Sequence, residues 1–327
     1  MVRSGNIVGA FLLCVVVVNG QSCTKDKPPT LDATGNALSG TIRVSGAWAL
    51  YPMMVRWSEE FRKVHPGFRI DISAGGAGKG LADALGGLVD LGMLSRDITA
   101  EETSRGAALV AVVKDSVFPT LNSSNRQLPK LLQTGIKKSI LAALWVGGRS
   151  LTWGELSGVA DPTPVQVYTR SDACGAAETW AKYLGGTQAD LQGVAVYGDP
   201  GLAEAVKKDP AAIGYNNLNY CFDGKTDRPQ EGLAVLPIDL DDNGKLDPGE
   251  LIQTRTAALA AVRSGKYPSP PTRELFLVTK KEFSGPARVF VGWILGAGQR
   301  FIPEAGYIAL TEERLKENLQ MLQGGAP

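Results

Sequence analysis

A regular alternation of short strands and helices limits the possible folds of this chain more than any other sequence pattern. Residues 40–46 (GTIRVSG) and 68–73 (FRIDIS) have the pattern of buried strands, and residues 53–66 (MMVRWSEEFRKVHP) carry apolar side chains at helical spacing until a proline ends the helix. A glycine-rich loop, a helix at 80–87 and a strand at 89–94 follow. This order predicts an α/β fold with a mainly parallel sheet, helices on both faces, and ligands at the carboxyl ends of the strands.

The rest of the chain repeats this alternation. A long apolar stretch at 108–122 has the length to cross from one part of the fold to another, and a second alternating region follows it. Its expected strands are residues 164–170, 194–198 and 212–217, and its expected helices are residues 176–185 and 201–209. After a proline-rich segment at 266–271 we expect a strand at 274–280 and a helix at 286–306. A chain of 327 residues is long enough for two domains.

Residues 1–22 have the layout of a secretory signal peptide. Their apolar run, Ile7 to Val18, has twelve residues, fewer than the roughly 20 that a membrane span needs. Cys23 then begins a polar tether, residues 23–39, and this arrangement resembles the acylation site of a bacterial lipoprotein. We therefore expect an exported protein that is anchored to the membrane by a lipid on Cys23. Ordinary secretion into the periplasm is the alternative.

Composition excludes several kinds of function. The formal net charge is +1 and acidic and basic residues are interspersed, so the chain does not have the basic surface of a nucleic-acid-binding protein. A single histidine excludes catalysis or metal binding built on several histidines. Cys174 and Cys221 lack CxxC spacing, but they can pair in an oxidising compartment if their Cα atoms lie about 4.4–6.8 Å apart.

The loop SAGGAGKG, residues 73–80, raises the question of a nucleotide site. A Walker A loop needs a glycine where this chain has Ser73 and a hydroxyl side chain where it has Gly80, so that motif is excluded. Two interpretations remain open for the loop alone. Its glycines can allow close packing between a helix and a strand, or they can bring backbone N–H groups at a helix N-terminus against an anion.

Three stretches decide between these interpretations. The chain resembles the phosphate-binding components of bacterial phosphate ABC transporters in three stretches. They are residues 40–102, which contain the glycine loop, residues 144–158 (LWVGGRSLTWGELSG) and residues 167–186 (VYTRSDACGAAETWAKYLGG). The resemblance continues in the family's order through residues 209–217 and 267–280. It implies an α/β, two-lobed class II periplasmic-binding-protein fold, with each lobe a mainly parallel sheet flanked by helices and the ligand cleft between the lobes.

The resemblance also implies domain boundaries and a function. Residues 40–115 and 268–327 are expected to form one lobe, and residues 116–267 the other. The expected function is capture of phosphate or a related oxyanion for import by an ABC permease, by a monomer without enzymatic activity. Two alternatives stay open: a sensor or adhesion module on the same fold, and a hydrolase that uses Cys174 in the cleft.

The family's binding residues are carried over position by position. Arg170 and Asp172 match the arginine and acid of its R-x-D-x-S-G-T signature, and an arginine can grip two oxygens of an oxyanion. Ser95 falls where some members have an acidic proton acceptor, so discrimination against sulfate is expected to relax. The remaining expected contacts are backbone N–H groups of Tyr51, Gly78, Gly175 and Ala176.

Several hydroxyl groups of the family pattern are missing from this chain. The positions concerned are Leu50, Ala77, Cys174 and Ala176. Each hydrogen bond to a charged group is worth about 1.5–3 kcal/mol. We therefore expect phosphate binding weakened by several orders of magnitude unless Lys79 or Arg96 compensates.

Cys174 allows three interpretations. It follows Arg170 closely and lies near an expected helix N-terminus, where the pKa of a thiol can fall and make it a nucleophile. It can instead be a small replacement for serine, or half of a disulfide with Cys221. No histidine is near it in sequence, and His65 is more simply a helix-end residue.

Residues 239–250 (DLDDNGKLDPGE) match the pattern of a twelve-residue Ca²⁺ loop. The expected ligands of a structural Ca²⁺ are Asp239, Asp241, Asn243, the Lys245 carbonyl, Asp247 and a bidentate Glu250. The alternative is an acidic turn that caps a helix, with Pro248 at its first position.

Overall fold

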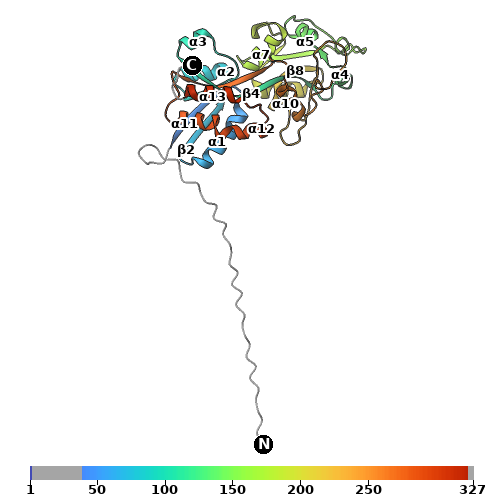
Figure 1. Cartoon of the computed structure of the whole chain (residues 1–327). Coiled ribbons are helices and arrows are strands. Elements are labelled where there is room, and N and C mark those ends of the chain that lie inside the picture. Colours follow the sequence, from blue (N-terminus) through green and yellow to red (C-terminus); the bar gives the residue numbers. More distant parts are fainter. Residues whose placement is uncertain (2–38, 323–327) are drawn as a thin grey trace.

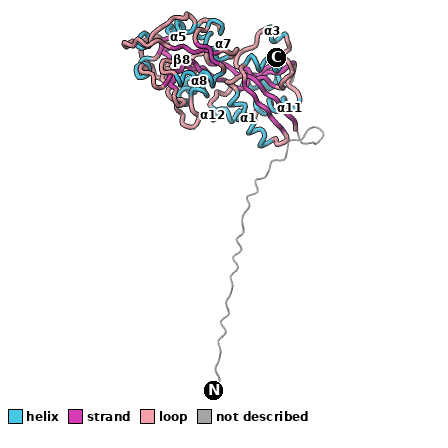
Figure 2. The backbone as a smooth tube through the Cα atoms, turned by 180° about the vertical axis from the view of Figure 1, so that it is seen from behind, coloured by secondary structure: helices cyan, strands magenta, loops and turns pink. Residues whose placement is uncertain are grey.

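The computed structural model describes Met1 and residues 39–322. The expected signal peptide, the tether up to residue 38 and the acylation site at Cys23 lie outside the described residues. Segments from the two ends of the described chain, blue, cyan and red in Figure 1, gather on one side of the molecule, and the middle of the chain lies on the other. Seen from behind, the strands form one band with helices on either side (Figure 2).

The strands form one nine-stranded sheet in the order β2-β1-β3-β11-β4-β8-β6-β7, with β9 also paired to β4. Its strands are β1 (Gly40–Gly46), β2 (Phe68–Ala74), β3 (Leu91–Leu94), β4 (Ala107–Asn122), β6 (Gln166–Arg170), β7 (Val194–Val196), β8 (Ala212–Asn217), β9 (Leu233–Val235) and β11 (Thr272–Lys280). A second small sheet pairs β5 (Ile136–Lys137) with β10 (Ile238–Asp239).

The pairing is parallel at both ends of the large sheet and antiparallel in its middle. β1 is parallel to β2 and β3, and β6 is parallel to β7 and β8. β11 runs antiparallel to β3 and β4, and β4 runs antiparallel to β8 and β9. The expected parallel pairing therefore holds only at the ends, because β4 carries the chain out of the first half and β11 brings it back in the opposite direction.

Helices cover both faces. They are α1 (Tyr51–Val64), α2 (Ala77–Leu85), α3 (Ala100–Ser104), α4 (Leu128–Thr134), α5 (Lys138–Trp145), α6 (Trp153–Ser157), α7 (Gly175–Leu184), α8 (Gly198–Lys208), α9 (Leu218–Cys221), α10 (Arg255–Arg263), α11 (Gly285–Leu295), α12 (Ile302–Ala305) and α13 (Glu312–Leu322), with short 3₁₀ turns at Gln188–Asp190 and Ala297–Phe301. Within residues 39–322, none of these helices combines the length and apolarity needed to cross a bilayer.

Two expected helices differ from the structure. The helix expected at 286–306 divides at Gly296 into α11, a 3₁₀ turn and α12. The helix expected from Pro248 is wrong at its start, because α10 begins at Arg255. The Thr254 side chain caps α10 by accepting a 3.0 Å hydrogen bond from the Ala257 N–H. The helix therefore starts after the capping hydroxyl of Thr254, which lies closer to the apolar residues of α10 than Pro248 does.

Buried side chains form two large hydrophobic cores. The first is built from residues 42–113 and 275–322 and includes Trp57 and Phe290. The second is built from residues 117–267 with the addition of Ile308, and includes the stacked pair Trp180 and Tyr215. Burial of each such side chain contributes about 1.5–3 kcal/mol. The two cores meet where β4 and β11 cross from one to the other.

Close backbone packing explains part of the glycine loop. A Cβ atom on Gly80 would lie 2.7 Å from the Met93 carbonyl oxygen and 2.8 Å from the Gly46 Cα, so α2 can pack on β1 and β3 only if this residue is glycine. Gly46 itself has a φ of +132°. The packing interpretation is therefore confirmed at Gly80, and the anion-binding interpretation stays a prediction.

Candidate functional site

Arg170 lies at the carboxyl end of β6 and its side chain is fully buried. Its Nε and Nη2 donate hydrogen bonds of 2.8 Å and 2.6 Å to the two carboxylate oxygens of Asp172. Its Nη1 donates a 2.6 Å hydrogen bond to Asp199 Oδ2. Burial alone would lower the pKa of Arg170, but the Asp199 and Asp172 carboxylates outweigh burial and raise it. Arg170 is thus a permanent cation held by two carboxylates.

Asp199 also contacts Arg170, although no sequence motif predicted it. It lies in the first turn of α8, is 2% exposed, and accepts a 2.6 Å hydrogen bond from Asn217 Nδ2 on its second oxygen. The three residues lie at the carboxyl ends of three neighbouring parallel strands. Arg170 ends β6, Asn217 ends β8, and Asp199 follows β7 in the first turn of α8. The rule that ligands bind at the carboxyl ends of parallel strands would have found Asp199 and Asn217.

The glycine loop faces Asp172 and Ala173. The Gly78 N–H, in the first turn of α2, donates a 3.3 Å hydrogen bond to the Ala173 carbonyl oxygen. A Cβ atom on Gly76 would lie 2.8 Å from Asp172 Oδ2, so the loop approaches this carboxylate closely. Ala77 is fully buried. Two segments about 95 positions apart in sequence therefore meet here, as the resemblance implied.

Ser95 and Gly175 meet in the same way. The Gly175 N–H, at the start of α7, donates a 3.2 Å hydrogen bond to Ser95 Oγ. A Cβ atom on Gly175 would lie 1.9 Å from the Ser95 carbonyl oxygen, so this contact requires glycine. Ala176 follows in α7 and is 2% exposed.

Leu50 and Tyr51, two further expected contacts, belong to the first hydrophobic core or pack against it. Leu50 is fully buried in the first core, and the Tyr51 N–H donates a 3.2 Å hydrogen bond to the Trp48 carbonyl oxygen within its own turn. Tyr220 OH donates a 3.1 Å hydrogen bond to the same Trp48 oxygen, which joins this turn to the second core. In this structure the expected donors of Tyr51, Gly78 and Gly175 therefore bond to protein atoms.

The two expected compensating cations are already paired. Lys79 forms an ion pair with Asp83, which also accepts a 2.7 Å hydrogen bond from Ser45 Oγ. Arg96 donates hydrogen bonds of 2.9 Å and 2.7 Å to Glu102, and these bonds lower the pKa of Glu102 to about 2. Neither cation replaces a missing hydroxyl in this arrangement.

Cys174 is a buried cap rather than an activated thiol. Its sulfur accepts a 3.5 Å hydrogen bond from the Ala177 N–H at the N-terminus of α7. Burial raises the pKa of Cys174 to about 12 although Arg170 acts in the opposite direction. The expectation that its pKa could fall is wrong, because desolvation of the thiolate exceeds the attraction of the guanidinium. Cys174 and Cys221 are both free, so the disulfide interpretation is also wrong.

Asn217 connects the site to Arg273 of β11. Arg273 donates a hydrogen bond from Nη2 to Asn217 Oδ1 and a 3.1 Å hydrogen bond from Nε to the Ser95 carbonyl oxygen. Its Nη1 lies 4.0 Å from Asp115 Oδ2 on β4. A buried network of charged and amide groups thus runs from Arg170 to the crossing strands.

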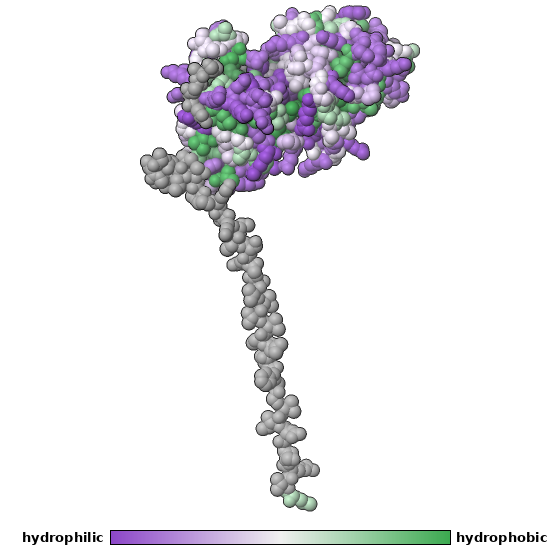
Figure 3. All heavy atoms as spheres, in the orientation of Figure 1, coloured by the Kyte–Doolittle hydropathy of each residue, from purple (hydrophilic) through white to green (hydrophobic). Residues whose placement is uncertain are grey.

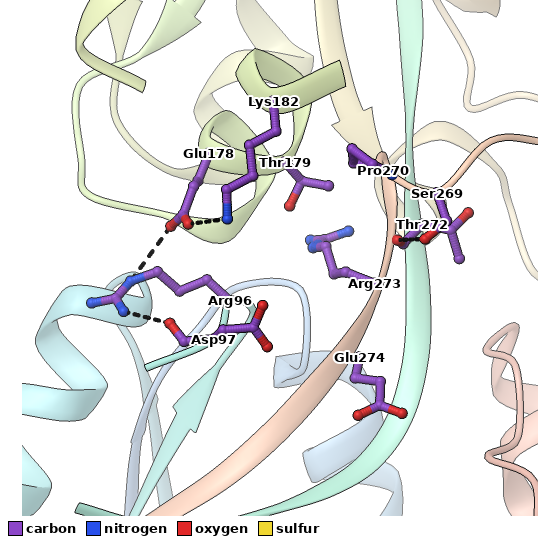
Figure 4. Close-up of a pocket in the computed structure, with 10 residues that line it drawn as sticks. All are labelled: Arg96, Asp97, Glu178, Thr179, Lys182, Ser269, Pro270, Thr272, Arg273 and Glu274. Atoms are coloured by element: carbon purple, nitrogen blue, oxygen red, sulfur yellow. Dashed lines mark hydrogen bonds and ion pairs between the residues drawn. The ribbon is translucent and has the colours of Figure 1, made fainter. Parts of the chain in front are cut away.

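A cavity of about 340 Å³ lies beside this network (Figure 4). Arg96 and Asp97 line it from the first half, Glu178 and Lys182 line it from α7, and Arg273 points into its middle from β11. Arg96 Nε lies 3.7 Å from Glu178 Oε2, so an ion pair closes one side of the cavity. None of the expected oxyanion contacts lines this cavity.

The expected Ca²⁺ loop follows the end of β10. Carboxylate oxygens of Asp239, Asp241 and Glu250 lie within 4.8 Å of one another. Asp239 is 1% exposed and its two oxygens accept hydrogen bonds from the N–H groups of Asn243 and Gly244. Asn243 Nδ2 joins Asp241 at 2.8 Å and Asp247 at 3.2 Å. The Lys245 side chain is exposed. This agrees with its expected role, because only its backbone carbonyl oxygen would contact the ion.

Comparison with known proteins places the chain in a protein family. Residues 32–297 match the family described as the PBP superfamily domain. The chain is 24% identical over 312 residues to the phosphate-binding protein PstS of Bacillus subtilis (strain 168), covering 94% of each protein. It is 25% identical over 371 residues to the phosphate-binding protein PstS of Methanocaldococcus jannaschii, covering 94% of this chain and 89% of that protein.

Solved structures support the fold. A substrate-binding protein assigned to phosphate ABC transport in Clostridium perfringens, solved with bound phosphate, aligns with a TM-score of 0.67 at 21% identity, covering 83% of this chain and all of that one. An ABC-type phosphate transport receptor from Vibrio cholerae aligns with a TM-score of 0.58 at 16% identity, covering 82% of this chain and all of that one. At these identities the likeness concerns the α/β fold.

Proposed function

This chain belongs to the PBP superfamily, and we propose that it is an extracytoplasmic solute-binding protein that captures phosphate or a related oxyanion for an ABC-type importer. The observation that carries the proposal is Arg170, a buried guanidinium where the N-terminal ends of α2 and α7 meet. A guanidinium fork matches two oxygens of an oxyanion, and helix N-termini favour negative charge. The similarity to proteins named as phosphate-binding supports the same ligand class.

A two-lobed class II arrangement follows from the same proposal. The two hydrophobic cores support lobes at residues 40–115 with 268–327 and at 116–267. Ile308 departs from this division, because it packs in the second core although it pairs with Lys114 of the first lobe. β4 and β11 connect the two cores, so bending of these two strands would open the cleft.

The structure corresponds to a closed cleft in this interpretation. The Gly78 N–H and the Gly175 N–H each bond to an atom from the opposite lobe. A ligand can reach these donors only when the lobes separate, so opening precedes binding. Separation would break these two neutral hydrogen bonds, worth about 0.5–1.5 kcal/mol each, together with the Tyr220–Trp48 hydrogen bond and the Arg96–Glu178 ion pair, which also join the lobes.

Calorimetry on the purified protein tests the proposal. The protein is dialysed into phosphate-free buffer and titrated with phosphate, sulfate, molybdate and a small organophosphate. We expect phosphate to bind, and Arg170→Gln to weaken binding by about 100-fold or more, since a charged hydrogen-bonding partner is removed. Arg149→Gln, which removes an exposed arginine outside the site, is the matched control. Absence of heat with every anion would reject the function.

Two alternative functions make different predictions. A sensor or adhesion module would bind a ligand without a partner permease, so a permease gene beside this one argues for transport. A hydrolase would need Cys174 as its nucleophile, and the raised pKa of that buried thiol argues against it. Turnover that is lost in Cys174→Ala would reverse this conclusion.

Residues 239–250 support a second proposal, that the protein binds a structural Ca²⁺. The loop has the full spacing of oxygen donors for Ca²⁺, and three of its carboxylates converge in the structure. β10 and β5 anchor the loop at its start, since Ile238 pairs with Ile136. Isolated extracellular loops of this type bind at about 10⁻⁴–10⁻³ M.

Thermal melting with and without Ca²⁺ tests this second proposal. We expect millimolar Ca²⁺ to raise the melting temperature and EDTA to lower it again, because an ion that binds only the folded state stabilises it. Glu250→Gln should abolish the shift, whereas Glu231→Gln, outside the loop, should keep it. A melting temperature that changes with neither Ca²⁺ nor EDTA would reject the site.

The membrane anchor remains a third proposal, because Cys23 and residues 1–22 lie outside the described part of the chain. Acylation of Cys23 would hold the binding protein beside its permease. Mass spectrometry of the protein from its native membrane should find a lipid on Cys23, and Cys23→Ser should release the protein into the soluble fraction.

A further inference from the structure

Asp199 occupies the face of Arg170 that an anion would need. Asp172 accepts hydrogen bonds from Nε and Nη2 of the guanidinium, and Asp199 accepts a 2.6 Å hydrogen bond from Nη1. The Arg170 side chain is then completely covered. An oxyanion cannot contact Nη1 while the Asp199 carboxylate stays in this position.

The Asp199 carboxylate makes the pair of bonds that an oxyanion could make. One oxygen accepts from Arg170 Nη1, and the other accepts a 2.6 Å hydrogen bond from Asn217 Nδ2. Two oxygens of a tetrahedral anion can take the same two donors. The position is also favourable for negative charge, because Asp199 lies in the first turn of α8.

The local charge opposes a second anion. The single guanidinium of Arg170 already has two carboxylate partners, Asp172 and Asp199. An incoming anion must displace Asp199 or lie beside it, and like charges in contact repel strongly where water is excluded. Either way, the carboxylate reduces the affinity for the ligand.

We propose that Asp199 is an internal competitor for Arg170, which sets a weak affinity for oxyanions and so limits capture to high ligand concentrations. This inference rests on the proposed function and adds a residue that determines affinity. It predicts that the protein becomes a tighter binder when the negative charge at residue 199 is removed.

Calorimetry with phosphate and with sulfate tests the inference, in buffer free of both anions. We compare the native protein with Asp199→Asn, which keeps the shape of the side chain, and Asp199→Ala, which also removes its bulk. We expect both variants to bind phosphate about tenfold more tightly or better, since the anion no longer competes with a carboxylate. Glu204→Gln removes one negative charge from the same helix at an exposed position and should leave the affinity unchanged.

The outcomes separate this inference from the proposed function. A native protein that binds phosphate, with equal or weaker binding in both folded variants, overturns the role of Asp199 and leaves the function standing. Failure of the native protein and both variants to bind either anion overturns both. Thermal melts of each variant establish that it is folded, and Asp199→Ala supplies the comparison if Asp199→Asn still holds Arg170 through its amide oxygen.

Discussion

Asp115 and Arg273 face each other where the two longest strands cross between the cores. They are register partners in β4 and β11, and Asp115 Oδ2 lies 4.0 Å from Arg273 Nη1. Asp115 is 1% exposed, and neither of its carboxylate oxygens has a well-formed hydrogen bond in the structure. Asp115 is therefore a buried carboxyl group beside Arg273, whose own hydrogen bonds go to Ser95 and Asn217.

This pair should make stability depend on pH. Burial raises the pKa of Asp115 to about 7 in spite of the nearby Arg273. The folded state then binds a proton more tightly than the unfolded state, whose aspartate pKa is about 3.9. Between these values the free energy of unfolding should fall as pH rises, by a few kcal/mol in total. Urea unfolding at pH 5, 6, 7 and 8 measures this slope.

Asp115→Asn is the variant that identifies the source of that slope. It removes the titrating proton and keeps the size of the side chain, so the fall in stability between pH 5 and 8 should be strongly reduced. Asp190→Asn, at an exposed capping residue whose pKa is lowered by its hydrogen bonds to Thr187, should keep the slope. A native slope that persists in Asp115→Asn would contradict the assignment.

Gly175→Ala should damage both stability and ligand binding. Its Cβ would lie 1.9 Å from the Ser95 carbonyl oxygen, a contact that forces the α7 N-terminus away from Ser95. Overpacking of this kind costs about 1–3 kcal/mol. Gly292→Ala in α11, where a Cβ meets only Leu322 Cδ2 at an ordinary 3.5 Å, should be neutral or slightly stabilising. Chemical unfolding compares the two variants.

Arg170 should matter for folding as well as for binding. Replacing it with glutamine leaves Asp172 and Asp199 without their cation, and breaking a buried ion pair from one side costs about 3–5 kcal/mol. Arg170→Gln with Asp199→Asn should recover part of this loss, because one of the two uncompensated charges is removed. A double variant as unstable as the single one would show that Asp199 does not need Arg170.

Cys174 and Cys221 should resist thiol reagents in the folded protein. Both are buried, and burial raises the pKa of each thiol. Maleimide should label neither residue under native conditions without reductant, and both after denaturation. Labelling of Cys174 in the native state would reopen its role as a nucleophile, whereas failure to label after denaturation would indicate a disulfide.

Sequence patterns predicted most strands of the large sheet and the helices α1, α2, α7 and α8, because these elements depend on local order. Residues 40–46 and 212–217 are the strands β1 and β8 as expected, and α1 ends near Pro66. Apolar periodicity and proline act over a few residues, so they can be read without the fold. The positions of Arg170, Asp172, Ser95 and the glycine loop were likewise available from motifs, and the structure brings these segments together.

Local patterns in the sequence predicted most strands of the large sheet, the residues that match the family's signature, and the missing hydroxyl groups. Three further features came from the folded chain: β4 and β11 make the centre of the sheet antiparallel, Cys174 is an inert buried thiol, and Asp199 holds the free face of Arg170. Strand direction, burial and ion pairing depend on neighbours that are distant along the chain, so local patterns do not show them. Asp199 lies 29 residues from Arg170 in sequence, and folding brings their charged atoms to 2.6 Å.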